Sequence, residues 1–190
     1  FLVKNVPYIE PGAVNPMKAH AVEFFKNGRV QRRRIKEHPS YPYGFLREEI
    51  QEHIFDKMQL LVESKRIKGT FENGTEYTIV ATILNMPKEI VRLIQKFDFT
   101  KKNPKLIYVN TGEKMISLED TILTAFLNLA GFDVIFFVPT GYQNIEHFFN
   151  KRLMEEHQIG EYVYDLQVPN MALISSSTRP TWRDKLFRRG

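Results

Sequence analysis

Apolar residues recur at three- and four-residue spacing in the first half of the chain, a period that predicts amphipathic helices. The clearest helix is expected over 45–66. Its apolar positions are Leu46, Ile50, Ile54, Met58, Leu61 and Val62. A weaker pattern predicts a helix over 17–27 that ends at Gly28. The stretch 76–97 has strand composition at its start, but its period favours two helices that meet at Pro87.

Short apolar runs replace this period in the second half of the chain. The runs 105–109, 133–138 and 161–165 predict strands, and the first lacks polar alternation, as expected for a strand covered on both faces. Helical spacing predicts helices over 117–130 and 144–157. The resulting order is that of half a doubly wound sheet. We therefore predict an α/β fold, namely a Rossmann-like three-layer parallel sheet half-unit with an N-terminal helical portion.

These patterns divide the chain into three sections. A helical N-terminal portion is expected over 1–100, a Rossmann-like β-α-β-α-β unit over 101–170, and a basic C-terminal arm over 171–190. Three prolines within 1–16 predict an irregular lead-in. Because the chain starts at Phe1 rather than at an initiator methionine, we interpret it as a piece of a longer protein.

The first two predicted strands end in a shared pattern, in which a valine is followed after one residue by threonine and glycine. Thr111 and Gly112 follow one strand, and Thr140 and Gly141 follow the other. Loops at the carboxyl ends of parallel strands are where open α/β sheets bind ligands. Glycine allows the backbone to approach a ligand, and threonine offers a hydroxyl group. We expect these four residues to contact a phosphorylated small molecule. In the alternative interpretation, the glycines only turn the chain.

Polar and aromatic residues just after the second loop extend this candidate site. Tyr142 is suited to stack on a base or sugar, and Glu146 to accept hydrogen bonds from hydroxyl groups. In the alternative interpretation, Asn144 caps the following helix and Glu146 is an acid in its first turn. Neither G-x-G-x-x-G nor G-x-x-x-x-G-K-S/T occurs, which argues against a conventional dinucleotide or P-loop site. The sequence assigns no cofactor and no catalytic residue.

Composition argues against several other classes. The chain has no cysteine, which excludes disulfides, thiolate metal sites and cysteine nucleophiles. Its five histidines lie outside metal-binding motifs, so we predict no metal site, and the G-x-S-x-G motif of α/β-hydrolases is absent. No run approaches the roughly 18 apolar residues of a membrane span, and the N-terminus lacks a signal-peptide pattern. We therefore predict a cytoplasmic location without membrane contact.

Positive charge is concentrated in two segments. The net charge is +5, from 27 basic and 22 acidic residues. One basic segment contains Arg32, Arg33 and Arg34, and the other lies in the C-terminal arm. We expect these three arginines to be exposed and to contact an anion or an acidic protein partner. No nucleic-acid-binding motif accompanies them, which argues against DNA or RNA as the partner.

Three blocks of the sequence resemble the YceG-like family. They are 103–107, 131–142 and 186–190. The resemblance implies that this chain is the C-terminal portion of a longer bacterial protein. It also implies a place in a biosynthetic module encoded in tellurium-resistance and stress-response operons. It transfers no catalytic residue.

Two functions from different classes fit these features. In the first, the chain belongs to a bacterial stress-response biosynthetic protein and contributes a Rossmann-like site for a nucleotide, nucleotide-sugar or sugar-phosphate. In the second, it is a non-enzymatic interaction module that docks a partner from the same operon or another anionic partner. A ligand pocket formed by 110–114 and 139–146 would favour the first function. A crevice filled by the protein's own side chains would favour the second.

Overall fold

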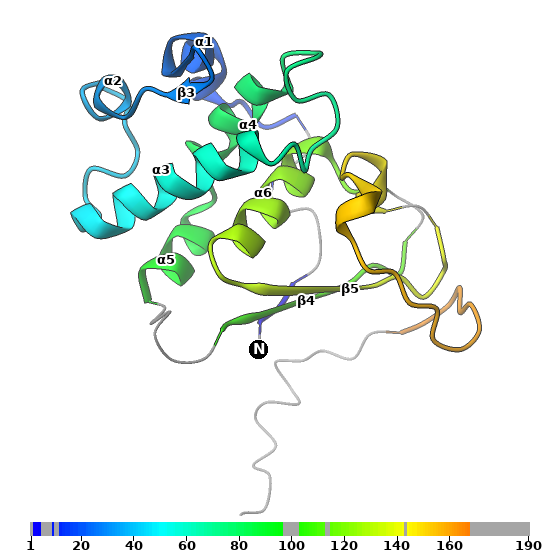
Figure 1. The fold of residues 1–190 in the computed structure, drawn as a ribbon. Helices are drawn as coiled ribbons and strands as arrows, with labels where there is room; N and C mark the ends of the chain where they lie inside the picture. Colours follow the sequence, from blue (N-terminus) through cyan, green and yellow to red (C-terminus); the bar gives the residue numbers. More distant parts are fainter. Residues whose placement is uncertain are drawn as a thin grey trace, which may run out of the picture.

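Helices and a small parallel sheet make up the computed structural model of this chain, a mixed α/β arrangement as predicted (Figure 1). The structure describes residues 2–4, 9, 12–96, 103–112, 115–142 and 144–167. None of the helices in these ranges has both the length and the apolar character needed to cross a bilayer.

The sheet contains three parallel strands in the order β1-β4-β5. They are β1 (Leu2–Lys4), β4 (Lys105–Val109) and β5 (Asp133–Phe137). In the register of the central strand, Leu106 pairs with Leu2 on one side and with Val134 on the other. The first two predicted strands are therefore confirmed as parallel neighbours.

The third strand of the sheet is a correction to the sequence prediction. We expected it at 161–165, but that segment has no regular secondary structure, and β1 comes instead from the predicted irregular lead-in. The amide of Val163 donates to the carbonyl of Pro139 (2.9 Å), which holds the segment beside the loop after β5 rather than in the sheet. The described residues therefore contain one parallel β-α-β unit, with β1 added at its edge.

The predicted helix over 144–157 is also wrong. Two short 3-10 helices take its place, η2 (Ile145–His147) and η3 (Lys151–Leu153). Asn150 separates them: its amide donates to the carbonyl of Arg66 (2.7 Å), and its side chain accepts from the amide of Arg152. These bonds to another part of the chain and to a new helix start prevent a continuous helix.

The longer predicted helices are confirmed. They are α3 (Glu48–Glu63), α4 (Thr75–Ile83), α5 (Lys88–Lys96) and α6 (Leu118–Leu129). The helix α6 begins as its sequence indicates, because the Ser117 hydroxyl accepts from the amide of Asp120 (3.0 Å) as an N-cap.

The N-terminal helix predicted over 17–27 is shorter than expected. It comprises η1 (Pro16–His20) and α1 (Ala21–Phe24), and the chain then forms a hairpin of β2 (Phe25–Lys26) and β3 (Arg29–Val30). The hairpin turns at Asn27 and Gly28, whose φ angles are 51° and 72°. An Asn-Gly pair favours this left-handed turn, so the hairpin was detectable in the sequence. The basic run continues into α2 (Arg32–Lys36).

The core lies on one face of the sheet. Leu106 and Tyr108 of β4 are buried against α6 and the helices around it, and Figure 1 shows the labelled helices on this side of the strands. On the opposite face, Ile135 and Phe137 of β5 are 47% and 46% exposed. The expectation of cover on both faces was made for β4, whose Ile107 and Val109 are half-buried on this opposite face, so that within the described residues the cover there is only partial.

Candidate functional site

The loops after β4 and β5 lie side by side, as the sequence predicts. We call residues 110–112 and 138–142 the carboxyl-edge loops. The amide of Asn110 donates to the carbonyl of Phe137 (2.9 Å), which joins the two loops at their start. The amide of Gly112 donates to the side-chain oxygen of Asn110, which turns the first loop. Thr111 is half-buried and Gly112 is exposed.

Buried polar groups without hydrogen bonds lie in the second loop and at the residue before η2. Thr140 and Asn144 are only 4% and 1% exposed. The Thr140 hydroxyl and both polar atoms of the Asn144 amide have no hydrogen-bond partner in the described part of the chain. Each such buried group costs about 1–3 kcal/mol. Asn144 does precede η2, but its side chain makes no capping bond, and its backbone has the unusual angles φ −129° and ψ −118°.

Aromatic side chains partly fill the space beside this loop. Gly141 has a φ of 69°, and a Cβ at this position would overlap the ring of Tyr162. Tyr142 is 43% exposed and meets Tyr164 edge to face, with ring centroids 6.2 Å apart. The structure therefore brings the two predicted Thr-Gly loops together, but it places residues of 160–166 against one of them.

The predicted role of Glu146 changes because the expected helix is missing. Glu146 is half-buried in η2, which is too short to provide the N-terminal dipole of a helix. Its backbone carbonyl accepts from the Lys68 ammonium (2.9 Å), which also donates to the carbonyl of His147 (3.1 Å). Glu119 and Asp120 lie in the first turn of α6, where negative charge opposes phosphate binding. This edge is therefore better suited to hydroxyl and amide groups than to a bare phosphate.

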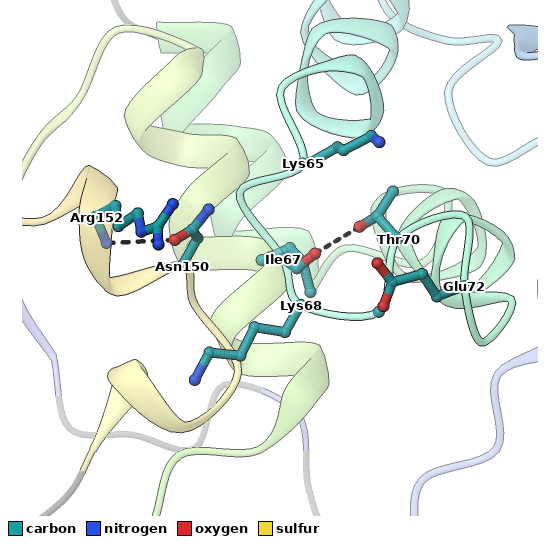
Figure 2. Close-up of a pocket in the computed structure, with 8 residues that line it drawn as sticks. Lys65, Ile67, Lys68, Thr70, Glu72, Asn150 and Arg152 are labelled. Atoms are coloured by element: carbon teal, nitrogen blue, oxygen red, sulfur yellow. Dashed lines mark hydrogen bonds between the residues drawn. The ribbon is translucent and has the colours of Figure 1, made fainter.

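A pocket of about 370 Å³ lies beside the 3-10 helices, and none of the predicted site residues lines it (Figure 2). Its lining residues are Lys65, Ile67, Lys68, Gly69, Thr70, Glu72, Asn150 and Arg152. The Lys68 ammonium is occupied by the two backbone carbonyls described above, and the Lys65 ammonium lies 5.8 Å from the centroid of the Phe71 ring. Sequence reasoning missed this pocket, because nothing in the sequence indicates that 65–72 and 150–152 meet.

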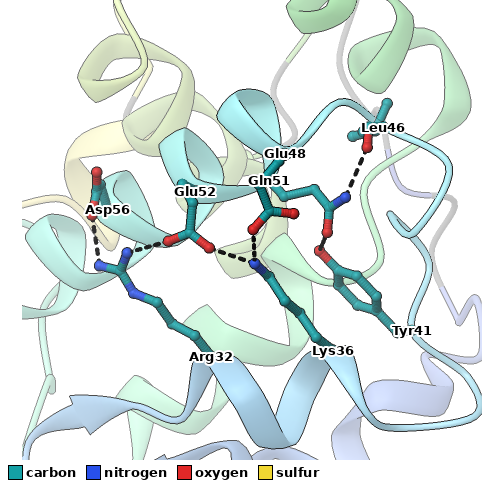
Figure 3. A network of polar contacts seen from close by, with 8 residues as sticks. All are labelled: Arg32, Lys36, Tyr41, Leu46, Glu48, Gln51, Glu52 and Asp56. Atoms are coloured by element: carbon teal, nitrogen blue, oxygen red, sulfur yellow. Dashed lines mark hydrogen bonds and ion pairs between the residues drawn. The ribbon is translucent and has the colours of Figure 1, made fainter.

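The arginine segment forms ion pairs within the protein (Figure 3). The Arg32 guanidinium donates to Glu52 (2.5 Å) and to Asp56 (2.6 Å), both on α3. Lys36 donates to Glu48 and Glu52 (2.5 Å each). Hydrogen bonding to Lys36 lowers the pKa of the Glu52 carboxyl below its ordinary value, against the opposing effect of burial. The network attaches α2 to α3.

The other two predicted arginines are also paired. Arg33 donates to Glu37 (2.8 Å) and Arg34 to Glu23 (2.5 Å). The side chains of Arg33 and Arg34 are 91% and 53% exposed, as expected, whereas that of Arg32 is 38% exposed. Because each guanidinium already has a carboxylate partner, the argument for an anionic partner at this segment is weaker than the sequence alone indicates.

Metal-ligating residues are not gathered anywhere in the described ranges: no group of three or more histidines, aspartates or glutamates could hold an ion there.

Together, these features define an α/β protein with a small parallel sheet and polar loops at the carboxyl edge of that sheet. The chain belongs to the YceG domain family, whose model matches residues 1–168. It is similar to a protein of Bacillus subtilis (strain 168) named "Uncharacterized protein YceG", with 22% identity over 177 residues. That similarity covers 91% of this chain and 33% of the relative, so the chain spans about a third of the relative's length. No solved structure matches the chain.

Proposed function

We propose that this chain contributes a site for a nucleotide, nucleotide-sugar or sugar-phosphate to a longer bacterial protein of the YceG domain family. The observation that carries the proposal is the burial of Thr140 and Asn144 without hydrogen-bond partners in the described residues. The tellurium-resistance and stress-response context, the biosynthetic role, the C-terminal position and a cytoplasmic location belong to the same proposal. They rest on the family resemblance and on the sequence.

The chemistry of the two side chains supports recognition of hydroxyl groups or a base edge. The Asn144 amide offers a donor and an acceptor, and the Thr140 hydroxyl offers both. A sugar hydroxyl or a base edge also presents donors and acceptors, so a ligand of this class would satisfy all three unpaired atoms. Their place after β5, at the carboxyl edge of the sheet, is where such ligands bind in open α/β sheets.

The segment 160–166 covers this loop and would have to move to admit a ligand. Tyr162, Tyr164 and Leu166 on it are 54%, 64% and 42% exposed. The hydrogen bond from the Val163 amide to the Pro139 carbonyl connects it to the loop. Displacing an exposed segment with so little buried area costs little free energy compared with opening a core element.

A second candidate function is the non-enzymatic interaction module. The packing of Tyr162 against Gly141 favours it, because the protein's own side chain occupies space that a ligand would need. In that case the unpaired polar groups of Thr140 and Asn144 lower the stability of the protein and bind no ligand. A screen of small molecules would then find no binder.

A thermal-shift experiment with matched variants separates the two functions. A longer family chain that contains this segment is screened with nucleoside mono- and diphosphates, nucleotide-sugars and sugar phosphates. A binder raises the Tm by mass action. Asn144→Leu and Thr140→Val should each raise the Tm of the ligand-free protein and abolish its ligand response, because they remove unpaired polar groups that the ligand would satisfy.

Thr82→Val is the matched control for both variants. Thr82 is fully buried on α4, and its hydroxyl also has no partner in the described residues, but it lies in the helical core. This variant should raise the Tm and leave the ligand response intact. If no compound in the panel shifts the Tm, or if the Asn144 and Thr140 variants respond as the parent does, the proposed site is wrong.

A further inference from the structure

One face of the sheet is apolar and only partly covered by the described residues. We call Ile107, Val109, Ile135 and Phe137 the outer face. They alternate with residues that point into the core, and Ile107 pairs with Ile135 and Val109 with Phe137 in the register. Ile107 and Val109 are half-buried, and the two β5 residues are close to half exposed.

A charged pair marks one end of the outer face. Lys105 and Asp133, paired in the same register, form an ion pair at the amino ends of β4 and β5. The apolar area therefore begins after this pair and continues to the carboxyl ends of the strands. Parallel sheets of this type are covered on both faces, because their strands carry apolar side chains on both. The outer face is the surface that such a cover would occupy.

The area of this face determines whether a separate protein or a connected segment of the same chain can pack on it. The outer face lies on two strands of five residues, at about 3.3 Å per residue and about 4.8 Å apart, so its footprint is roughly 160 Å². A stable interface between separate proteins needs about 800 Å² on each partner. By itself the outer face is therefore too small for a stable interface with a second copy of the chain or with a free partner. A segment of the same chain loses less translational and rotational entropy when it docks than a separate molecule does, so it can pack on an area of this size.

We infer that an amphipathic helix from another part of the longer family protein packs on the outer face. The chain spans about a third of the relative that it matches, so that relative has more chain than this segment accounts for. The helix would complete the Rossmann-like three-layer arrangement that the sequence predicts. This inference does not depend on whether the carboxyl-edge loops bind a ligand.

Thiol labelling tests the inference, because the chain contains no cysteine of its own. Ile135→Cys and Phe137→Cys are made in the 190-residue chain and in a longer family chain that contains it. Modification by a soluble maleimide is followed by peptide mass spectrometry. Both cysteines should react at least tenfold more slowly in the longer chain than in the 190-residue chain.

Two control positions make the comparison specific. Leu60 on α3 is 40% exposed, so Leu60→Cys should react equally fast in both chains. Ala81 on α4 is fully buried, so Ala81→Cys should be protected in both chains, which verifies that both are folded.

Three outcomes would overturn the inference. Equally fast labelling of residues 135 and 137 in both chains would mean that nothing covers the outer face. Protection already present in the 190-residue chain would mean that residues of this chain provide the cover. Protection of the longer chain that disappears on dilution would mean that a separate molecule provides it.

Discussion

The ring of Tyr162 lies against Gly141, so that a side chain at position 141 would overlap it. Gly141 also has a φ of 69°, in the left-handed region that side chains rarely adopt. Position 141 therefore favours glycine for two separate reasons. One is the backbone conformation of the second carboxyl-edge loop, and the other is the contact with the segment that covers this loop.

A double-mutant cycle separates these reasons. Gly141→Ala should destabilise the protein by about 1–2 kcal/mol for the positive φ, with a further loss from the contact with Tyr162. Tyr162→Ala alone should cost less than about 1 kcal/mol, because the ring is 54% exposed. In the double variant, the part of the stability loss that comes from the contact with Tyr162 should disappear, and the part that comes from the positive φ should remain. Urea denaturation measures both. Additive effects of the two changes would contradict a direct contact.

The sequence predicts the long helices and the two paired strands of this chain well, and the segments after β5 poorly. The periods of α3 and α6 are strong, and the Ser117 cap lies within one turn, so both helices are confirmed. The prediction of the third strand is wrong for a different reason. Whether β1 or 161–165 pairs with the edge of β4 depends on contacts between distant residues, which no local pattern reports.

In the candidate site, too, the sequence predicts the features that follow from neighbouring strands but not the contacts between distant segments. The proximity of the loops that contain Thr111 and Thr140 follows from the parallel pairing of two neighbouring strands, which the sequence predicts correctly. The pairing of Arg32 with α3 joins residues 20 and 24 positions apart, and only the fold determines it. The placement of Tyr162 over Gly141 likewise depends on a long-range approach.

Removal of the Arg32 guanidinium should weaken the attachment of α2 to α3. Arg32→Met keeps the apolar stem and removes the bonds to Glu52 and Asp56, so we expect a loss of about 1 kcal/mol in the free energy of unfolding. Arg33→Met is the control, and its effect should stay within about 0.5 kcal/mol because that side chain is 91% exposed. The difference between the two variants should decrease at high salt. Equal effects would show that Arg32 has no special structural role.

Acidification should weaken the same network. Hydrogen bonding to Lys36 and then to Arg32 lowers the pKa of Glu52 in the folded protein below its ordinary value of 4.5. A depressed pKa gives stability that is present above the unfolded value and lost as the pH falls through the folded value. The unfolding free energy should therefore depend less on pH below 4.5 in Glu52→Gln than in the parent protein.

Glu49→Gln is the control for this pH dependence. Glu49 is exposed on the same helix and forms no ion pair with another described residue, so its variant should follow the parent curve. Because the Glu52 side chain is 36% exposed, the difference should not exceed about 1 kcal/mol. Parallel curves for the parent and Glu52→Gln would contradict the assignment.

Lys68 should hold the 3-10 helices in place. Its ammonium donates to the carbonyls of Glu146 and His147, beside the isolated bridge between Ile67 and Phe149. In Lys68→Met these carbonyls lose their charged donor, so amide hydrogen exchange over 145–153 should accelerate while exchange in α3 stays unchanged. Lys65 lines the same pocket but makes no such bonds. Lys65→Met should therefore leave amide exchange over 145–153 unchanged. Acceleration in both variants would indicate a general effect of lost charge.

Tyr43 should contribute more to stability than its neighbour Tyr41. Its hydroxyl donates to the carbonyl of Ile83 and accepts from the amide of Met86 (3.1 Å), so it connects the end of α4 to the chain before α5. Tyr43 is 2% exposed, and burial raises the pKa of its hydroxyl. Tyr43→Phe leaves a buried amide and a buried carbonyl unpaired, which should lower the unfolding free energy by about 1–3 kcal/mol.

Tyr41→Phe is the matched control for this change. The Tyr41 hydroxyl donates to the side chain of Gln51 (2.8 Å; Figure 3) and is half-buried, so water can replace the lost bond. Its variant should lose less than about 1 kcal/mol in urea denaturation. A similar loss in both variants would mean that the two backbone groups bound by Tyr43 find other partners. In that case the connection between α4 and α5 would depend on apolar packing instead.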